Sequence, residues 1–109
     1  MPSIVTGTRR ERKAYPYLLQ QLEGPGAPQW IKLDRPELFL GRAEDADIKV
    51  PQPASRKHAI FRTEAGNCTV YDNDSRNGVY LNGLRIHSAV LHSKDLIQVG
   101  GCLFLFHEA

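Results

Sequence analysis

Short apolar or alternating runs make up most of the sequence, and residues that favour turns separate almost every run from the next. Runs that alternate apolar and polar residues are typical of β-strands with one buried face, and helical periodicity is scarce. We therefore predict an all-β fold, an antiparallel β-sandwich of about ten or eleven short strands. The expected strands include QWIKL, LFLGR, DIKV, HAIFRTE, CTVYD, VYL, LRIHSAVL, LIQV and CLFLF.

Two segments carry more specific local signals. Asn82-Gly83 separates two of the expected strands. A two-residue type I′ turn needs positive φ at both central residues, which Asn and Gly accept, so we expect a hairpin there. Tyr15–Glu23 (YPYLLQQLE) is the best helix candidate, and the Gly- and Pro-rich stretch at 24–28 ends it within about two turns.

The charge of the chain is unevenly distributed. The 109 residues carry a net charge of +2, but residues 1–14, with RRERK at 9–13, carry +3, which leaves −1 for residues 15–109. We predict a basic, disordered segment at 1–14 and one folded domain at 15–109. The folded domain is not expected to bind nucleic acid, whereas the basic run could be a nuclear-import signal or an attachment arm.

Other features indicate the compartment. The N-terminus lacks the apolar run of a signal peptide, and the longest apolar stretch, Cys102–Phe106, is too short to span a bilayer. We expect an intracellular protein, nuclear or cytoplasmic, without membrane contact. Cys68 is expected to be a buried thiol, like Cys102, rather than half of a disulfide. The strand aromatics expected in the core are Tyr80, Phe104 and Phe106.

Three loop segments carry groups suited to binding phosphate. They are Gly41-Arg42, Ser55–His58 (SRKH) and Asn73–Gly78 (NDSRNG), and each begins or follows an expected strand. Together they offer guanidinium, ammonium, hydroxyl and amide donors, and the planar arginine fork presents two parallel N–H bonds to a tetrahedral anion. Because loops of a sandwich gather at the ends of its sheets, we predict that these segments meet at one edge.

In order and spacing, these segments resemble the forkhead-associated (FHA) domain family, over roughly Leu38–Phe106. The matching positions are Gly41-Arg42, Asp47-Ile48, Ser55-Arg56-Lys57-His58, Val70 with Tyr71-Asp72, Ser75-Arg76-Asn77-Gly78, Leu81-Asn82-Gly83 and Val99-Gly100. The resemblance implies recognition of phosphothreonine peptides by an arginine cluster, with no catalysis and no cofactor. The expected partner is a phosphothreonine-containing protein or peptide, and the domain is expected to be a signalling module of a larger protein.

The resemblance also implies roles for individual residues. Arg42 and Ser55 are expected to contact the phosphate, with Arg56 adding a charged contact. Asn77 is expected to bind the peptide backbone just after the phosphothreonine. Arg76 is placed beside Asn77, although the family more often has a small or hydroxyl residue there, and it is expected to add positive potential. The expected structural supports are Gly41, His58, Gly78, Asn82 and Gly83, with His58 bracing the Ser55 loop.

Other functions are weighed against this one. Ser55 and His58 could suggest a nucleophile and its base, but a triad also needs an orienting carboxylate and an oxyanion hole, and nothing in the sequence forms a nucleophile elbow. His87, His92 and His107 stand singly, without the spacing of metal ligands, so no metal is expected. A phosphate-independent scaffold or dimerisation surface on the same fold remains an alternative, as does nucleic-acid attachment through residues 9–13.

Overall fold

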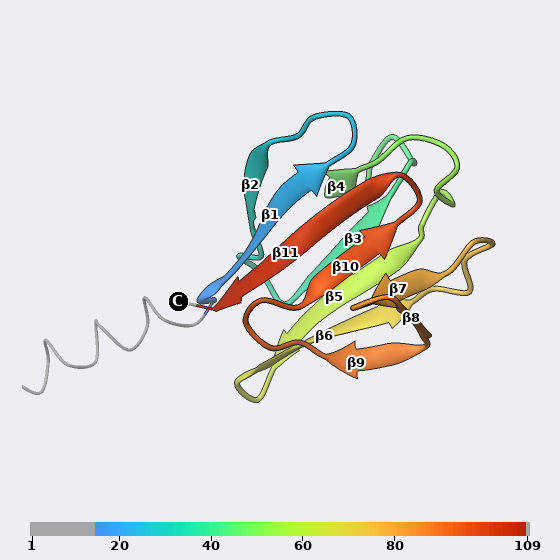
Figure 1. Cartoon of the computed structure of the whole chain (residues 1–109). Helices are drawn as coiled ribbons and strands as arrows, with labels where there is room; N and C mark the ends of the chain where they lie inside the picture. The colour runs from blue at the N-terminus through green and yellow to red at the C-terminus, as the bar shows by residue number, and fades with distance from the viewer. Residues whose placement is uncertain (1–14, 109) are drawn as a thin grey trace, which may run out of the picture.

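The computed structural model describes residues 15–108, and these residues form eleven strands and no helix. The basic segment predicted at 1–14 lies outside the described residues. Figure 1 shows two layers, a sheet of six strands in the order β2-β1-β11-β10-β7-β8 and a sheet of five in the order β4-β3-β5-β6-β9. The strands are β1 (Tyr17–Glu23), β2 (Gln29–Lys32), β3 (Glu37–Gly41), β4 (Ile48–Lys49), β5 (Ala59–Glu64), β6 (Asn67–Asp72), β7 (Val79–Leu81), β8 (Leu84–Ile86), β9 (Ser88–Val90), β10 (Leu96–Val99) and β11 (Cys102–Glu108).

The all-β sandwich predicted from the sequence is confirmed, and its strands are antiparallel except for β3 and β4, which pair in parallel. The helix predicted at Tyr15–Glu23 is wrong, because the segment forms β1. Tyr17, Leu19 and Gln21 are buried while the residues between them are less so, a period of two that only a strand produces. β1 pairs with β2 on one side and with β11 on the other.

A second difference lies in the expected strand LRIHSAVL. It divides at His87 into β8, which belongs to the six-stranded sheet, and β9, which belongs to the five-stranded sheet. The His87 carbonyl oxygen accepts a hydrogen bond of 2.8 Å from the Asp72 backbone N–H. The chain therefore passes from one layer to the other at this residue.

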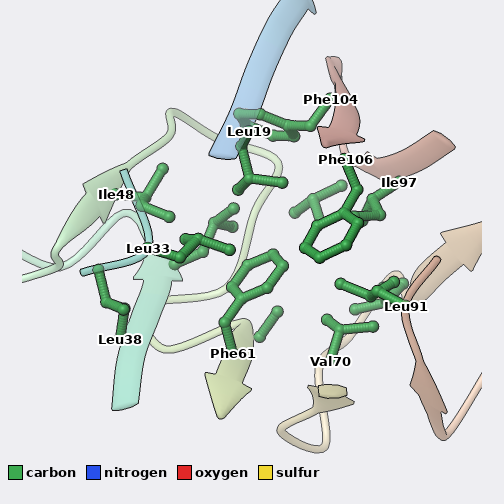
Figure 2. Packing of buried hydrophobic residues seen from close by; sticks show 14 of the residues in the cluster. Leu19, Leu33, Leu38, Ile48, Phe61, Val70, Leu91, Ile97, Phe104 and Phe106 are labelled. Carbon is green, nitrogen blue, oxygen red and sulfur yellow. The ribbon is translucent and has the colours of Figure 1, made fainter. Parts of the chain in front are cut away.

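The core lies between the two sheets. Figure 2 shows Phe61 and Val70 of the five-stranded sheet directed toward Leu19, Ile97 and Phe106 of the other sheet, and all five side chains are fully buried. Burying one such side chain stabilises the fold by about 1.5–3 kcal/mol, so this layer supplies a rigid support for the loops. Cys68 and Cys102 are also buried and free, as expected.

The expected core position of Phe104 and Phe106 is confirmed, whereas that of Tyr80 is wrong. Phe104 is fully buried, as is Val79 of β7, but Tyr80 follows Val79 on the opposite face of the strand and is half-buried. Successive side chains of a strand alternate between faces, so Tyr80 lies on the outer face of the six-stranded sheet.

The hairpin predicted at Asn82-Gly83 is confirmed. The two residues have φ angles of +50° and +87°, and Leu81 pairs with Leu84 across the turn. The Asn82 side chain has a further role, because its Oδ1 accepts a hydrogen bond of 2.9 Å from the Leu96 N–H. Its Nδ2 donates to Asp95 Oδ1 at 3.0 Å, so Asn82 fastens the hairpin to the start of β10.

Candidate functional site

Strand register brings the three polar loop segments to one end of the five-stranded sheet. Ala59, at the start of β5, pairs with Leu40 near the end of β3 on one side and with Asp72 at the end of β6 on the other. The connections β3–β4, β4–β5 and β6–β7 therefore leave the sheet side by side. In Figure 1 they lie at the end of the sandwich away from the C-terminus.

These connections enclose a surface cleft of about 480 Å³. Every residue predicted to contact phosphate or peptide lines it, and Gln52, Pro53 and Ala54 complete its wall. The predicted contacts in the lining are Arg42, Ser55, Arg56, Arg76 and Asn77. The prediction that the loops meet at one edge is confirmed, since Arg42 and Ser55 face the same cleft.

Ser55 is bonded to all three connections. Its carbonyl oxygen accepts from the Arg42 N–H at 3.1 Å, and its hydroxyl oxygen accepts from the Arg76 backbone N–H at 3.1 Å. Its own N–H donates to Nδ1 of His58 at 2.9 Å. Since the hydroxyl oxygen acts as an acceptor within the protein, its proton is free to be donated to an anion in the cleft.

The Arg42 side chain is held at one end and free at the other. Its Nε donates to the Ala54 carbonyl oxygen at 3.0 Å, which leaves the two terminal nitrogens of an exposed guanidinium for a ligand. The adjacent Ala43 N–H donates to the Arg56 carbonyl oxygen at 3.1 Å, so the backbones of Arg42 and Arg56 stay in register. None of the ion pairs found among residues 15–108 uses Arg42, Arg56 or Arg76.

His58 is fully buried behind the cleft and joins two of its walls. Its Nδ1 accepts from the Ser55 N–H, and its Nε2 lies 2.7 Å from the carbonyl oxygen of Gly78. A backbone N–H can only donate and a carbonyl can only accept, so the ring is the neutral tautomer with its proton on Nε2. The imidazole thus connects the β4–β5 and β6–β7 connections from the inside.

The β6–β7 connection is fixed by its own side chains. Asp72 Oδ1 accepts from the Ser75 N–H at 3.0 Å, and Ser75 Oγ accepts from the Gly78 N–H at 2.9 Å. Asn77 Nδ2 donates to the Pro53 carbonyl oxygen at 3.0 Å, which turns the amide toward the cleft. The contributions of Pro53 and Gln52 were not predicted, although they come just before the Ser55–His58 segment, because their side chains carry no charge and the Pro53 contact is made by a backbone carbonyl.

Two glycines are required, Gly41 by a close backbone approach and Gly78 by its positive φ. A Cβ on Gly41 would overlap the carbonyl oxygen of Arg56, so any other residue would push the Ser55-Arg56 segment away from Arg42. Gly78 has a φ of +89°, and a Cβ there would come within 2.6 Å of the Arg85 side chain. Both glycines therefore shape the site without contacting a ligand.

Comparison with known proteins identifies the fold and the family. The model of the FHA domain family matches residues 38–100, more than half of the chain. The chain belongs to the FHA domain family. The glycogen accumulation regulator GarA of Mycolicibacterium smegmatis is 40% identical over 90 residues, which are 82% of this chain and 57% of GarA. The oxoglutarate dehydrogenase inhibitor of Corynebacterium diphtheriae is 40% identical over 86 residues, 78% of this chain and 60% of that protein.

Solved FHA structures have the same architecture. The FHA domain of the CT664 protein of Chlamydia trachomatis superposes with a TM-score of 0.77 at 28% identity, covering 85% of this chain and 97% of that one.

The present chain spans only part of the length of the two curated relatives, 57% of GarA and 60% of the oxoglutarate dehydrogenase inhibitor. Those relatives are bacterial, so they give no support to the nuclear part of the expected localisation.

The geometry also argues against hydrolysis by the FHA domain. The Ser55 hydroxyl is bonded to the Arg76 N–H, while both nitrogens of the His58 ring are bonded to backbone groups. A general base needs a free ring nitrogen beside the nucleophile's proton, and His58 offers none.

Residues 15–108 contain no group of three or more His, Cys, Asp or Glu side chains placed to hold a metal ion. They also form no helix of the length and apolar character that crossing a bilayer requires.

Proposed function

We propose that this FHA domain recognises phosphothreonine in a partner protein and that the cleft at Ser55 holds the phosphate. The domain is a phosphopeptide-binding module of the signalling type and has no catalytic role. One observation carries the assignment of the site: register and hydrogen bonds bring Arg42, Ser55 and Arg56 into one cleft, and neither arginine forms an ion pair within residues 15–108.

The chemistry of the cleft suits a phosphate group. A phosphothreonine carries about −1.5 to −2 charges and three strong acceptor oxygens. The terminal nitrogens of Arg42 and the guanidinium of Arg56 supply charge-assisted donors, and the Ser55 hydroxyl supplies a neutral one. Because His58 fixes the Ser55 loop and the Arg42 Nε is bonded to Ala54, the Ser55 hydroxyl and the Arg42 guanidinium are oriented before the ligand arrives, which lowers the entropy lost on binding.

Asn77 is proposed to bind the peptide backbone. Its Nδ2 is bonded to Pro53, and its Oδ1 accepts no hydrogen bond from the described residues 15–108. That oxygen is available to an N–H group of an extended peptide running past the phosphothreonine. An interface of this size with one anchoring charge gives an affinity in the micromolar range, about −8 kcal/mol.

The relatives suggest a regulatory setting. Their names describe one as a regulator of glycogen accumulation and another as an inhibitor of oxoglutarate dehydrogenase. We propose that this domain acts in the same general way, as an intracellular module that attaches its parent protein to a phosphorylated partner.

Calorimetry with a phosphothreonine peptide library tests the function. The wild-type protein is expected to bind phosphorylated peptides and to ignore the same peptides without phosphate. Arg42→Ala leaves the phosphate without one of its charged donors and is expected to cost about 2–5 kcal/mol, which abolishes measurable binding. The matched control is Lys32→Ala, which removes an exposed cation outside the cleft and leaves binding unchanged. Equal binding of phosphorylated and plain peptides would instead support the scaffold alternative.

A further inference from the structure

The cleft carries more positive charge than one phosphate neutralises. Its lining contains three guanidinium groups, those of Arg42, Arg56 and Arg76, and no carboxylate. Of the acidic side chains in the surrounding connections, Glu44 lies 3.7 Å from Lys49 and Asp47 lies 2.9 Å from Arg35. Asp45 and Asp74, the other two, do not line the cleft. One phosphothreonine at about −2 therefore leaves roughly one guanidinium charge unmatched.

Arg76 belongs to the β6–β7 connection, whereas Arg42 and Arg56 come from the two connections that flank β4. Arg42 and Arg56 belong to segments that are hydrogen-bonded to each other on one wall, at Ser55 and Ala43. Arg76 comes from the opposite wall, where its backbone N–H donates to the Ser55 hydroxyl oxygen. Its side chain therefore starts beside the phosphate position but on the β6–β7 side of the cleft.

The wall that carries Arg76 also borders a second hollow. Asn77, the next residue, lines both the main cleft and this hollow of about 240 Å³ formed with Tyr80, Gln98 and Gly100. A peptide that runs from the cleft into this hollow would pass the Arg76-Asn77 turn. A second negative group at that residue would meet an arginine that has no ion-pair partner among residues 15–108.

We propose that this domain prefers a phosphothreonine with a second anionic group within one or two residues, and that Arg76 is the residue that selects it. The inference rests on the proposed phosphothreonine function. The second anion can be another phosphorylated side chain or a glutamate, because both present oxygen acceptors with negative charge to a guanidinium. A doubly phosphorylated segment is the stronger ligand of the two, since it carries more charge and more acceptor oxygens.

A peptide series separates the possible ligands. The reference peptide has one phosphothreonine between alanines. In its relatives, a second phosphothreonine or a glutamate replaces the alanine one or two residues before or after. Calorimetry measures each peptide with the wild-type protein, with Arg76→Gln and with Lys32→Gln, which removes the same charge outside the cleft. Thermal melting verifies that Arg76→Gln folds, as expected because only the backbone of Arg76 is bonded to Ser55.

We expect at least one doubly phosphorylated peptide to bind wild-type protein about tenfold more tightly than the reference peptide, with a smaller gain for glutamate at the same position. The gain is expected to fall below about threefold in Arg76→Gln and to persist in Lys32→Gln. It is also expected to shrink as the salt concentration rises.

Three results have distinct meanings. If the reference peptide binds but no second anion improves its affinity, the preference is refuted while the proposed function stands. If Arg76→Gln weakens all peptides by the same factor, Arg76 contacts the first phosphate and the selective role is refuted. If wild-type protein does not bind the reference peptide at all, the proposed function itself fails.

Discussion

Removal of the His58 imidazole separates the role of the brace from the role of the phosphate contacts. In His58→Ala, the Ser55 N–H and the Gly78 carbonyl oxygen both lose their hydrogen-bond partner behind the cleft. An unsatisfied buried donor or acceptor costs about 1–3 kcal/mol, so the pair costs about 2–6 kcal/mol, with the lower values applying if water enters the space left by the ring. A small domain has only about 5–15 kcal/mol of stability, so the loss is large.

Urea and thermal unfolding followed by circular dichroism measure this loss. At about 4–8 °C per kcal/mol for a domain of this size, the melting temperature is expected to fall by at least about 8 °C. His92→Ala is the matched control, because that side chain is exposed and accepts no hydrogen bond within residues 15–108, and its melting temperature is expected to stay unchanged. An unaltered midpoint for His58→Ala would refute the argument that the imidazole holds the two connections together.

Other perturbations follow from the same structure. Gly41→Ala places a methyl group against the carbonyl oxygen of Arg56. We expect weaker phosphopeptide binding, measured by calorimetry, and a loss of about 1–3 kcal/mol in the free energy of unfolding, measured in urea. Wild-type values for both would contradict the close approach. Burial raises the pKa of the Cys68 thiol to about 11. Native protein is therefore expected to react slowly with a thiol reagent at pH 8, because the thiolate is the reactive form. Rapid labelling of Cys68 would contradict its burial. The unfolded thiol ionises near pH 9.0 and the folded one only near 11, so the contribution of Cys68 to stability is complete below pH 9 and declines as the pH rises toward 11. Urea midpoints across that range are expected to fall less in Cys68→Ser, and parallel profiles for the two proteins would contradict this.

The strand pattern could be predicted because the local signals agreed with the tertiary fold. Alternating residues and turn residues bounded most strands, and Asn82-Gly83 specified its hairpin through the φ angles that it accepts. Tyr15–Glu23 misled because Leu18, Leu19 and Leu22 are also spaced like the apolar face of a helix. Pairing with β2 and β11 decides in favour of a strand, and that information lies more than eighty residues away for β11.

The sequence could predict which residues would gather at one cleft, but not the geometry of that cleft. The order of Gly41-Arg42, Ser55–His58 and Asn73–Gly78 resembled a known family, and the structure brings these segments together at one cleft. The sequence did not reveal that the Pro53 carbonyl oxygen accepts a hydrogen bond from the Asn77 side chain. Nor did it show that the chain changes sheet at His87, because alternation reports which face a residue occupies and not which sheet its strand joins.

Amide chemical shifts of the labelled protein, recorded while a phosphothreonine peptide is added, test the central claim most directly. If the three connections form one phosphate site, the largest shifts will fall on Arg42, Ser55, Arg56 and the Arg76-Asn77 pair, and the peptide without phosphate will leave these signals in place. Shifts confined to another face of the sandwich, or identical shifts with both peptides, would contradict the account.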